Sequence, residues 1–158
     1  MAYRRFLGFV IAALAISPAC PTMATNAPVP VFDCSFGAKR VRVVSVGAVL
    51  RYEFGRPSKA EMIVIGDPAL GTVRYHRTLF AHSENKQLRF VNGTFSYLLF
   101  NRFSTPDYQG MGAEDRSGLV VLKGDHTVAR LNCRSGGDFS TTFDFDRLPD
   151  DGEDAVPD

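Results

Sequence analysis

Apolar and polar residues alternate with a period of two along most of the chain, which predicts short β-strands rather than helices. In the segment 48–54, Leu50, Tyr52 and Phe54 lie on one side and Arg51 on the other. Clusters of glycine, proline, aspartate and serine separate such segments and indicate turns. The strands predicted in this way are 29–36, 39–46, 48–54, 60–65, 72–80, 87–91, 94–103, 119–123 and 126–133.

Short connections between these strands predict an all-β fold, an antiparallel meander of eight or nine strands. Asn92-Gly93 is typical of a two-residue hairpin turn, and Gly124-Asp125 predicts a last hairpin. The segment 94–103 is apolar on both faces, which favours a central position in a sheet. Because the edges of such a sheet must be protected, we expect closure into a small barrel; a two-layer sandwich is the alternative.

The N-terminal residues have the layout of a secretory signal peptide. Arg4 and Arg5 precede an uncharged run from Phe6 to Ile16, and small residues follow. We therefore expect a signal peptide over residues 1–24 and a periplasmic or secreted protein. The run is too short to cross a bilayer, and no later segment is longer, so no integral membrane span is expected. Cleavage after Ala19 instead would leave Cys20 as a site for a lipid anchor.

Two cysteines remain after cleavage at Ala24, one near each end of the predicted domain. They are Cys34 and Cys133. Because an exported chain passes through an oxidising compartment, we expect a disulfide between them.

Composition and charge narrow the function classes. The chain has 158 residues, 45% of them hydrophobic, and a formal net charge of +1, which suits one globular domain and gives no basic field for nucleic acid. We expect a β domain over residues 28–143. Residues 144–158 hold seven Asp or Glu against one Arg, which predicts a disordered acidic tail. This tail either rests on a basic flank or keeps the protein soluble, and we favour solubility.

Candidate catalytic chemistry is sparse in the sequence. The histidines are His76, His82 and His126, and no zinc, nucleophile-elbow or phosphate-loop motif occurs. We therefore expect no enzyme, no cofactor and no metal site.

The segment 104–118 is the one long irregular stretch, with three glycines and a proline. Long loops on rigid β scaffolds often carry binding sites. Tyrosine and arginine are common interface anchors, so we predict a protein-binding site at Tyr108, Arg116 and Ser117.

Several strings of the sequence carry a resemblance to known families. Tyr52-Glu53-Phe54-Gly55, Leu88-Arg89-Phe90-Val91-Asn92-Gly93 and the segment 118–133 resemble a family of small secreted bacterial proteins of undefined role. Ser117-Gly118 and Lys123-Gly124-Asp125 are similar to motifs of the periplasmic inhibitors of C-type lysozyme, small antiparallel barrels with an exposed Ser-Gly loop. The tyrosine expected after Ser-Gly and the tryptophan expected before the turn are missing.

These observations favour a non-enzymatic periplasmic module that binds or inhibits a protein partner, with cell-wall hydrolases among the candidates. The alternative is a structural or stress-related accessory protein of the cell envelope.

Overall fold

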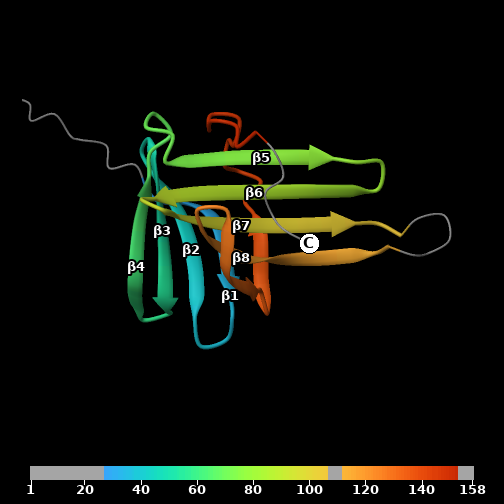
Figure 1. Ribbon diagram of the computed structural model, residues 1–158, viewed down its shortest axis with the longest axis horizontal. Coiled ribbons are helices and arrows are strands. Elements are labelled where there is room, and N and C mark those ends of the chain that lie inside the picture. Colours follow the sequence, from blue (N-terminus) through green and yellow to red (C-terminus); the bar gives the residue numbers. More distant parts are fainter. Residues whose placement is uncertain (1–26, 107–111, 153–158) are drawn as a thin grey trace, which may run out of the picture.

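The computed structural model describes residues 27–106 and 112–152, and within them the chain forms ten β-strands (Figure 1). All nine predicted strands are present. The strands are β1 (Val29–Ser35), β2 (Arg40–Val46), β3 (Val49–Arg56), β4 (Lys59–Gly66), β5 (Val73–Leu79), β6 (Ser83–Asn92), β7 (Phe95–Ser104), β8 (Glu114–Lys123), β9 (His126–Asn132) and β10 (Ser135–Phe139). None of the described residues belongs to a helix long and apolar enough to cross a membrane.

The strands form two antiparallel sheets, which corrects the expected barrel in favour of the sandwich. The first sheet has the order β10-β1-β2-β3-β4 and the second the order β5-β6-β7-β8-β9. The two sheets lie in separate layers, with their strands running crosswise (Figure 1). The ring stays open because neither β4 and β5 nor β9 and β10 pair. Residues 67–72 instead form a turn between the layers, with the Thr72 amide donating to the Asp67 carbonyl.

The tenth strand, β10, was missed in the sequence because its residues Ser135-Gly136-Gly137 look like a turn. It pairs with β1 and completes the first sheet. Both glycines have positive φ, and a Cβ at Gly137 would overlap the Ser117 hydroxyl of β8. Glycine is therefore required where this strand passes close to the second sheet.

Aromatic packing between the layers centres on Tyr52, which is fully buried. Its ring lies 5.4 Å from the rings of Phe90 and Tyr97, both in the second sheet. Burial raises the pKa of Tyr52 far above its usual range. The Tyr52 hydroxyl has no hydrogen-bond partner among the described residues, so this side chain stabilises the core through its ring.

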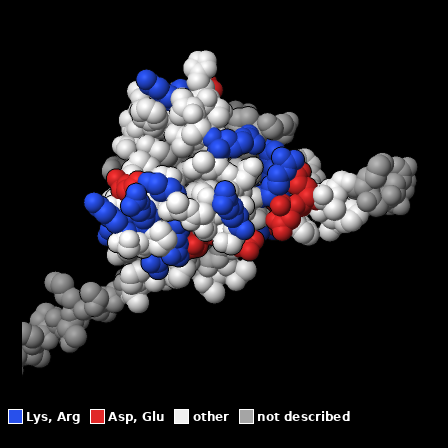
Figure 2. Space-filling model, turned by 90° about the horizontal axis from the view of Figure 1, so that it is seen from below, with Lys and Arg blue, Asp and Glu red and all other residues white. Residues whose placement is uncertain are grey.

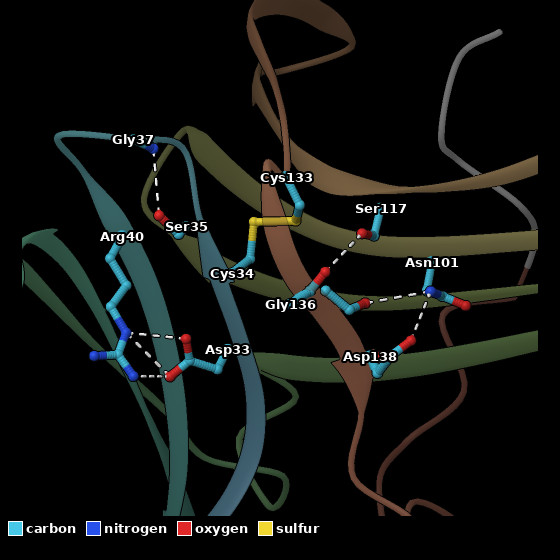
Figure 3. Close-up of a disulfide and its surroundings, with 11 residues drawn as sticks. Asp33, Cys34, Ser35, Gly37, Arg40, Asn101, Ser117, Cys133, Gly136 and Asp138 are labelled. Carbon is cyan, nitrogen blue, oxygen red and sulfur yellow. Dashed lines mark hydrogen bonds and ion pairs between the residues drawn. A yellow bond between two sulfur atoms is a disulfide. The ribbon is translucent and has the colours of Figure 1, made fainter.

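The predicted disulfide between Cys34 and Cys133 is confirmed, and it joins the two sheets (Figure 3). Cys34 lies in β1 of the first sheet, and Cys133 directly follows β9 of the second. The Arg134 amide then donates to the Ser35 carbonyl at 2.7 Å. The last part of the chain is thereby fixed to the first strand.

Residues 144–152 do not form the disordered tail that we expected. Phe145 stacks on Tyr75 of β5 with the ring centroids 4.5 Å apart, and Leu148 is buried in the core. The Tyr75 amide donates to the Pro149 carbonyl, and the Asp151 amide donates to the Tyr75 carbonyl. The apolar residues between the acidic ones thus pack onto the domain, and residues 149–151 cover part of the edge of β5. Residues 1–26 and 153–158, including the predicted signal peptide and Cys20, lie outside the described residues.

Reduction of the disulfide should lower the melting temperature strongly. The bridge spans 99 residues of sequence, and a loop of that length contributes about 4–5 kcal/mol in the chain-entropy model. Thermal unfolding with and without reductant measures this effect. The double variant C34A/C133A is the control and should not respond to reductant; equal melting temperatures of the oxidised and reduced wild-type protein would contradict the prediction.

Tyr52→Phe should leave the free energy of unfolding unchanged or raise it slightly, because the variant removes a buried hydroxyl without a described partner. Tyr52→Ala should cost about 3–5 kcal/mol, the usual loss for a buried aromatic ring. Urea denaturation of both variants provides the comparison. A large loss in Tyr52→Phe would mean that the hydroxyl makes an important bond.

Candidate binding surface

Two of the three predicted binding residues, Arg116 and Ser117, lie in a strand rather than in a loop. Tyr108 lies outside the described residues. Arg116 and Ser117 lie in β8, which begins at Glu114 because residues 114–118 continue the pairing with β7. The expected long loop is therefore much shorter than residues 104–118.

Arg116 and Ser117 also point to opposite faces of the second sheet. The Ser117 hydroxyl points toward β10 and donates to the Gly136 carbonyl at 3.5 Å (Figure 3). Arg116 pairs with Glu114, and its side chain is 62% exposed. A depression of about 210 Å³ includes both residues together with Asn132 and Arg134. Of these two side chains, that of Arg116 is the one exposed enough to contact a large partner.

The outer face of the second sheet, the surface of β5–β9 that points away from the first sheet, has an apolar centre. Leu98 and Phe100 of β7 and Val120 and Leu122 of β8 form a cluster separate from the main core. Their exposed fractions are between 0 and 7%. Among the described elements, no strand of the first sheet packs on this side, so the second sheet buries apolar residues on both faces.

Arginine side chains surround this apolar centre, one from each strand of the sheet. Strand register places Arg89 beside Leu98, and Arg130 beside Val120. Arg102 and Arg116 stand directly opposite each other on β7 and β8. The five residues are Arg74, Arg89, Arg102, Arg116 and Arg130. Like charges in directly opposite positions are unfavourable unless anions lie near them, and Glu114 supplies one such carboxylate to Arg116.

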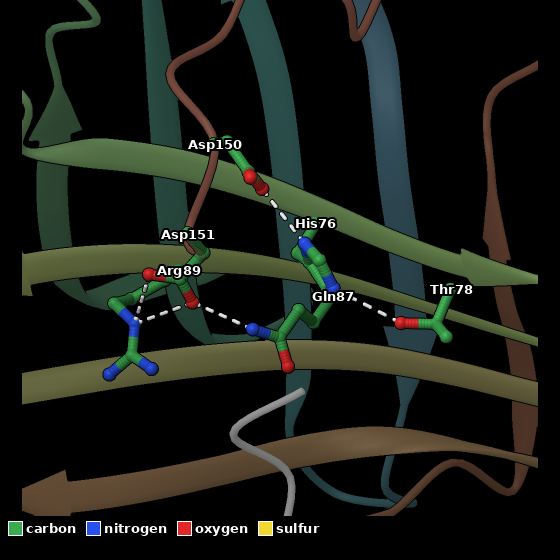
Figure 4. Close-up of polar contacts among 6 residues, drawn as sticks. All are labelled: His76, Thr78, Gln87, Arg89, Asp150 and Asp151. Carbon is green, nitrogen blue, oxygen red and sulfur yellow. Dashed lines mark hydrogen bonds and ion pairs between the residues drawn. The ribbon is translucent and has the colours of Figure 1, made fainter. Parts of the chain in front are cut away.

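The chain supplies a second such carboxylate, that of Asp151 (Figure 4). It accepts hydrogen bonds from Arg89 Nε at 2.8 Å and from Gln87 Nε2 at 2.7 Å. The Asp151 side chain is only 3% exposed and that of Arg89 is 17% exposed. Burial of an ion pair requires such additional hydrogen bonds to offset the loss of hydration. The outer face therefore binds a carboxylate in the folded protein.

Asp150 is held by a second set of contacts on β5 (Figure 4). Its carboxylate lies 2.8 Å from His76 Nδ1, and this bond holds the pKa of Asp150 below its usual value. His76 Nε2 lies 3.0 Å from the Thr78 hydroxyl. A hydroxyl, an imidazole and a carboxylate in this order can activate a nucleophile, but acyl transfer also needs donors aimed at the oxyanion. We assign His76 a positioning role toward Asp150.

A groove of about 420 Å³ lies beside β5 and offers the main alternative site. Tyr75 and Phe143 give it an aromatic wall, and Arg77, Lys86 and Asp146 bring both charge signs to its rim. Figure 2 likewise shows basic and acidic groups close together on the side of the molecule that it presents. This mixture gives the groove less charge preference than the outer face of the second sheet has.

The described residues that could serve in catalysis or metal binding do not come together in one site. Ser117 and His126 stand at opposite ends of the β8–β9 pair, about 20 Å apart at the usual rise per residue. No group of His, Cys, Asp or Glu residues in the described ranges could hold a metal ion. A search against protein-family models, curated proteins and solved structures found no match.

The sequence contains a partial signal for the outer face that we did not use. Each arginine lies out of phase with the core residues of its own strand, as Arg89 does between Leu88 and Phe90. That these arginines meet on one face depends on the strand order and register.

Asp151→Ala should destabilise the protein by about 2–3 kcal/mol, because it leaves the partly buried Arg89 without its charged hydrogen-bond acceptor. Asp150→Ala is the matched control. Its carboxylate is 71% exposed, so its removal should change the free energy of unfolding very little. Urea denaturation at neutral pH measures both variants, and equal losses would show that the buried contact has no special weight.

Proposed function

We propose that this chain is an exported binding module that recognises a protein partner through a segment combining acidic and apolar residues, and that the outer face of the second sheet receives this segment. The observation that carries the proposal is the Asp151 carboxylate held on this face by Arg89 and Gln87. A partner would add a further carboxylate at Arg116 of the same face, whose side chain is 62% exposed.

The residue types on this face support recognition of carboxylates. A guanidinium group can donate two parallel hydrogen bonds to a carboxylate, which gives both attraction and orientation. The arginines lie on five different strands of a rigid sheet, so their spacing is set by the fold. Arg130 also lies over the Phe100 ring, 5.9 Å from its centroid, which places positive charge beside the apolar centre.

A protein partner suits this surface better than nucleic acid does. The arginines of the outer face surround apolar side chains that are at most 7% exposed, so a partner would contact mainly the guanidinium groups, which suit the carboxylates of a protein segment. Cell-wall hydrolases remain one candidate partner class, since glycosidases carry paired carboxylates in an accessible cleft. The disulfide is compatible with an oxidising compartment, as an exported protein requires.

Selection of random displayed peptides on the full chain tests the proposal. We expect the bound peptides to be enriched in Asp or Glu on either side of an aliphatic residue. Arg116→Ala and Arg130→Ala should each weaken a selected peptide by about tenfold, the loss expected for an interface anchor worth about 1.4 kcal/mol. Added salt should weaken binding further.

The control for these substitutions is Arg56→Ala. Arg56 lies at the end of β3 in the first sheet, its side chain is 73% exposed, and its nearest carboxylate is Glu61 at 3.8 Å. Peptide affinity should be unchanged in this variant. Selected peptides without acidic residues, or equal affinity in all three arginine variants and the wild type, would refute the proposal.

A further inference from the structure

We propose that the groove beside β5 binds a neutral oligosaccharide. This site is separate from the outer face of the second sheet and takes a ligand without charge, so the inference does not depend on the proposed protein partner. Three features of the groove support it: its elongated shape, its partly exposed aromatic rings, and the balance of charged and hydroxyl groups that line it.

The groove extends along β5 into a second depression. The groove has a volume of about 420 Å³ and the second depression one of about 360 Å³. Tyr75 and Arg77 of β5 line both, as do Phe145 and Asp146, so the two form one continuous hollow between β5 and the segment 140–150 (Figure 1). Sites for small ligands usually have volumes of about 300–1,000 Å³. A hollow of this length suits a chain of sugar units better than one compact ligand.

Aromatic side chains form the apolar part of the groove. Tyr75 and Phe145 stack with their ring centroids 4.5 Å apart, and neither residue is fully buried. Phe139 and Phe143 pack against Phe145 at interplanar angles of 87° and 74° and hold it in place. The face of an aromatic ring is electron-rich, so it attracts the slightly positive C–H bonds of a sugar ring. The aromatic cluster therefore offers a sugar a fixed apolar surface.

The charged groups that line the groove balance each other. They are two cations, Arg77 and Lys86, and two carboxylates, Asp144 and Asp146. Both cations also pair with Glu84, so their charge is not available to attract an acidic ligand. The same two cations, beside the carboxylates, oppose a cationic ligand. Charged side chains in such a balanced set can form charge-assisted hydrogen bonds with neutral hydroxyl groups.

Two polar groups of the groove have no hydrogen-bond partner among the described residues, the Tyr75 hydroxyl and the Asp146 carboxylate. Burial raises the pKa of Tyr75 to about 12, so its hydroxyl stays protonated at neutral pH and can donate a hydrogen bond. The Asp146 carboxylate can accept several hydrogen bonds. Sugar hydroxyls both donate and accept, so neighbouring hydroxyls of one chain can satisfy both groups.

Titration of the full chain with neutral oligosaccharides tests the inference. The probes are fragments of cellulose, chitin and amylose with two to four sugar units, and isothermal titration calorimetry measures their binding. At least one series should bind, with an affinity that rises with chain length and does not change with added salt, because the ligand has no charge. Absence of binding by every series at about 10 mM, well above a weak dissociation constant of about 1 mM, would overturn the inference. Tighter binding of acidic galacturonic acid oligomers would overturn the neutral ligand class.

Two variants locate the bound oligosaccharide. Tyr75→Phe keeps the ring and removes the hydroxyl, so it should weaken binding about threefold to tenfold, the loss expected for one hydrogen bond, without lowering the melting temperature. Asp146→Ala removes a charged acceptor and should weaken binding at least about tenfold. The matched controls are Tyr97→Phe, next to Tyr52 in the core, and Asp125→Ala, in the turn between β8 and β9; both should bind as the wild type does. Wild-type affinity in both groove variants would show that the groove is not the site.

Discussion

The second sheet carries apolar side chains on both faces, and this constraint determines the architecture and the candidate surface together. Leu99 of β7 faces the main core, whereas its neighbours Leu98 and Phe100 face the other way. A sheet of this kind needs a cover on each side, since exposed apolar area is unfavourable. The first sheet covers one face, and on the outer face arginine side chains border apolar residues that are at most 7% exposed.

The arginines determine which ligands the outer face prefers. An apolar centre alone would attract many hydrophobic segments, but a ring of arginines selects those with carboxylates. Asp151 already illustrates the selected chemistry, because it is buried against Arg89 and Gln87. The contacts of Asp151 with Arg89 and Gln87 also hold residues 149–151 along β5. The same arginine therefore fixes the path of this segment and favours a carboxylate on the outer face.

Much of the fold could be predicted from local pattern. Alternation located nine strands, and the two apolar faces of 94–103 correctly placed β7 at the centre of its sheet. The disulfide could be predicted because only two cysteines, Cys34 and Cys133, remained in the predicted domain. The choice between barrel and sandwich depends on whether β4 pairs with β5 and β9 with β10, which alternation along one strand does not report. The strand β10 was missed because its glycines serve a close approach to Ser117 that only the folded molecule contains.

The site was harder to predict because its residues come from strands distant in the sequence. Arg116 was predicted to lie in a loop, since Glu114-Asp115-Arg116-Ser117 shows no apolar alternation. Those residues become a strand through pairing with β7. Residues 144–152 were misjudged because their acidic residues outweighed Phe145 and Leu148, whose partners on β5 and in the core are distant in sequence.

Chemical-shift mapping of a bound acidic peptide on the isotopically labelled full chain tests the central claim most directly. The account predicts that the perturbed methyl and amide signals belong to the outer face, with Leu98, Phe100 and Val120 among the most affected. Perturbations confined to the first sheet or to the groove beside Tyr75, with the signals of this outer face unchanged, would contradict it.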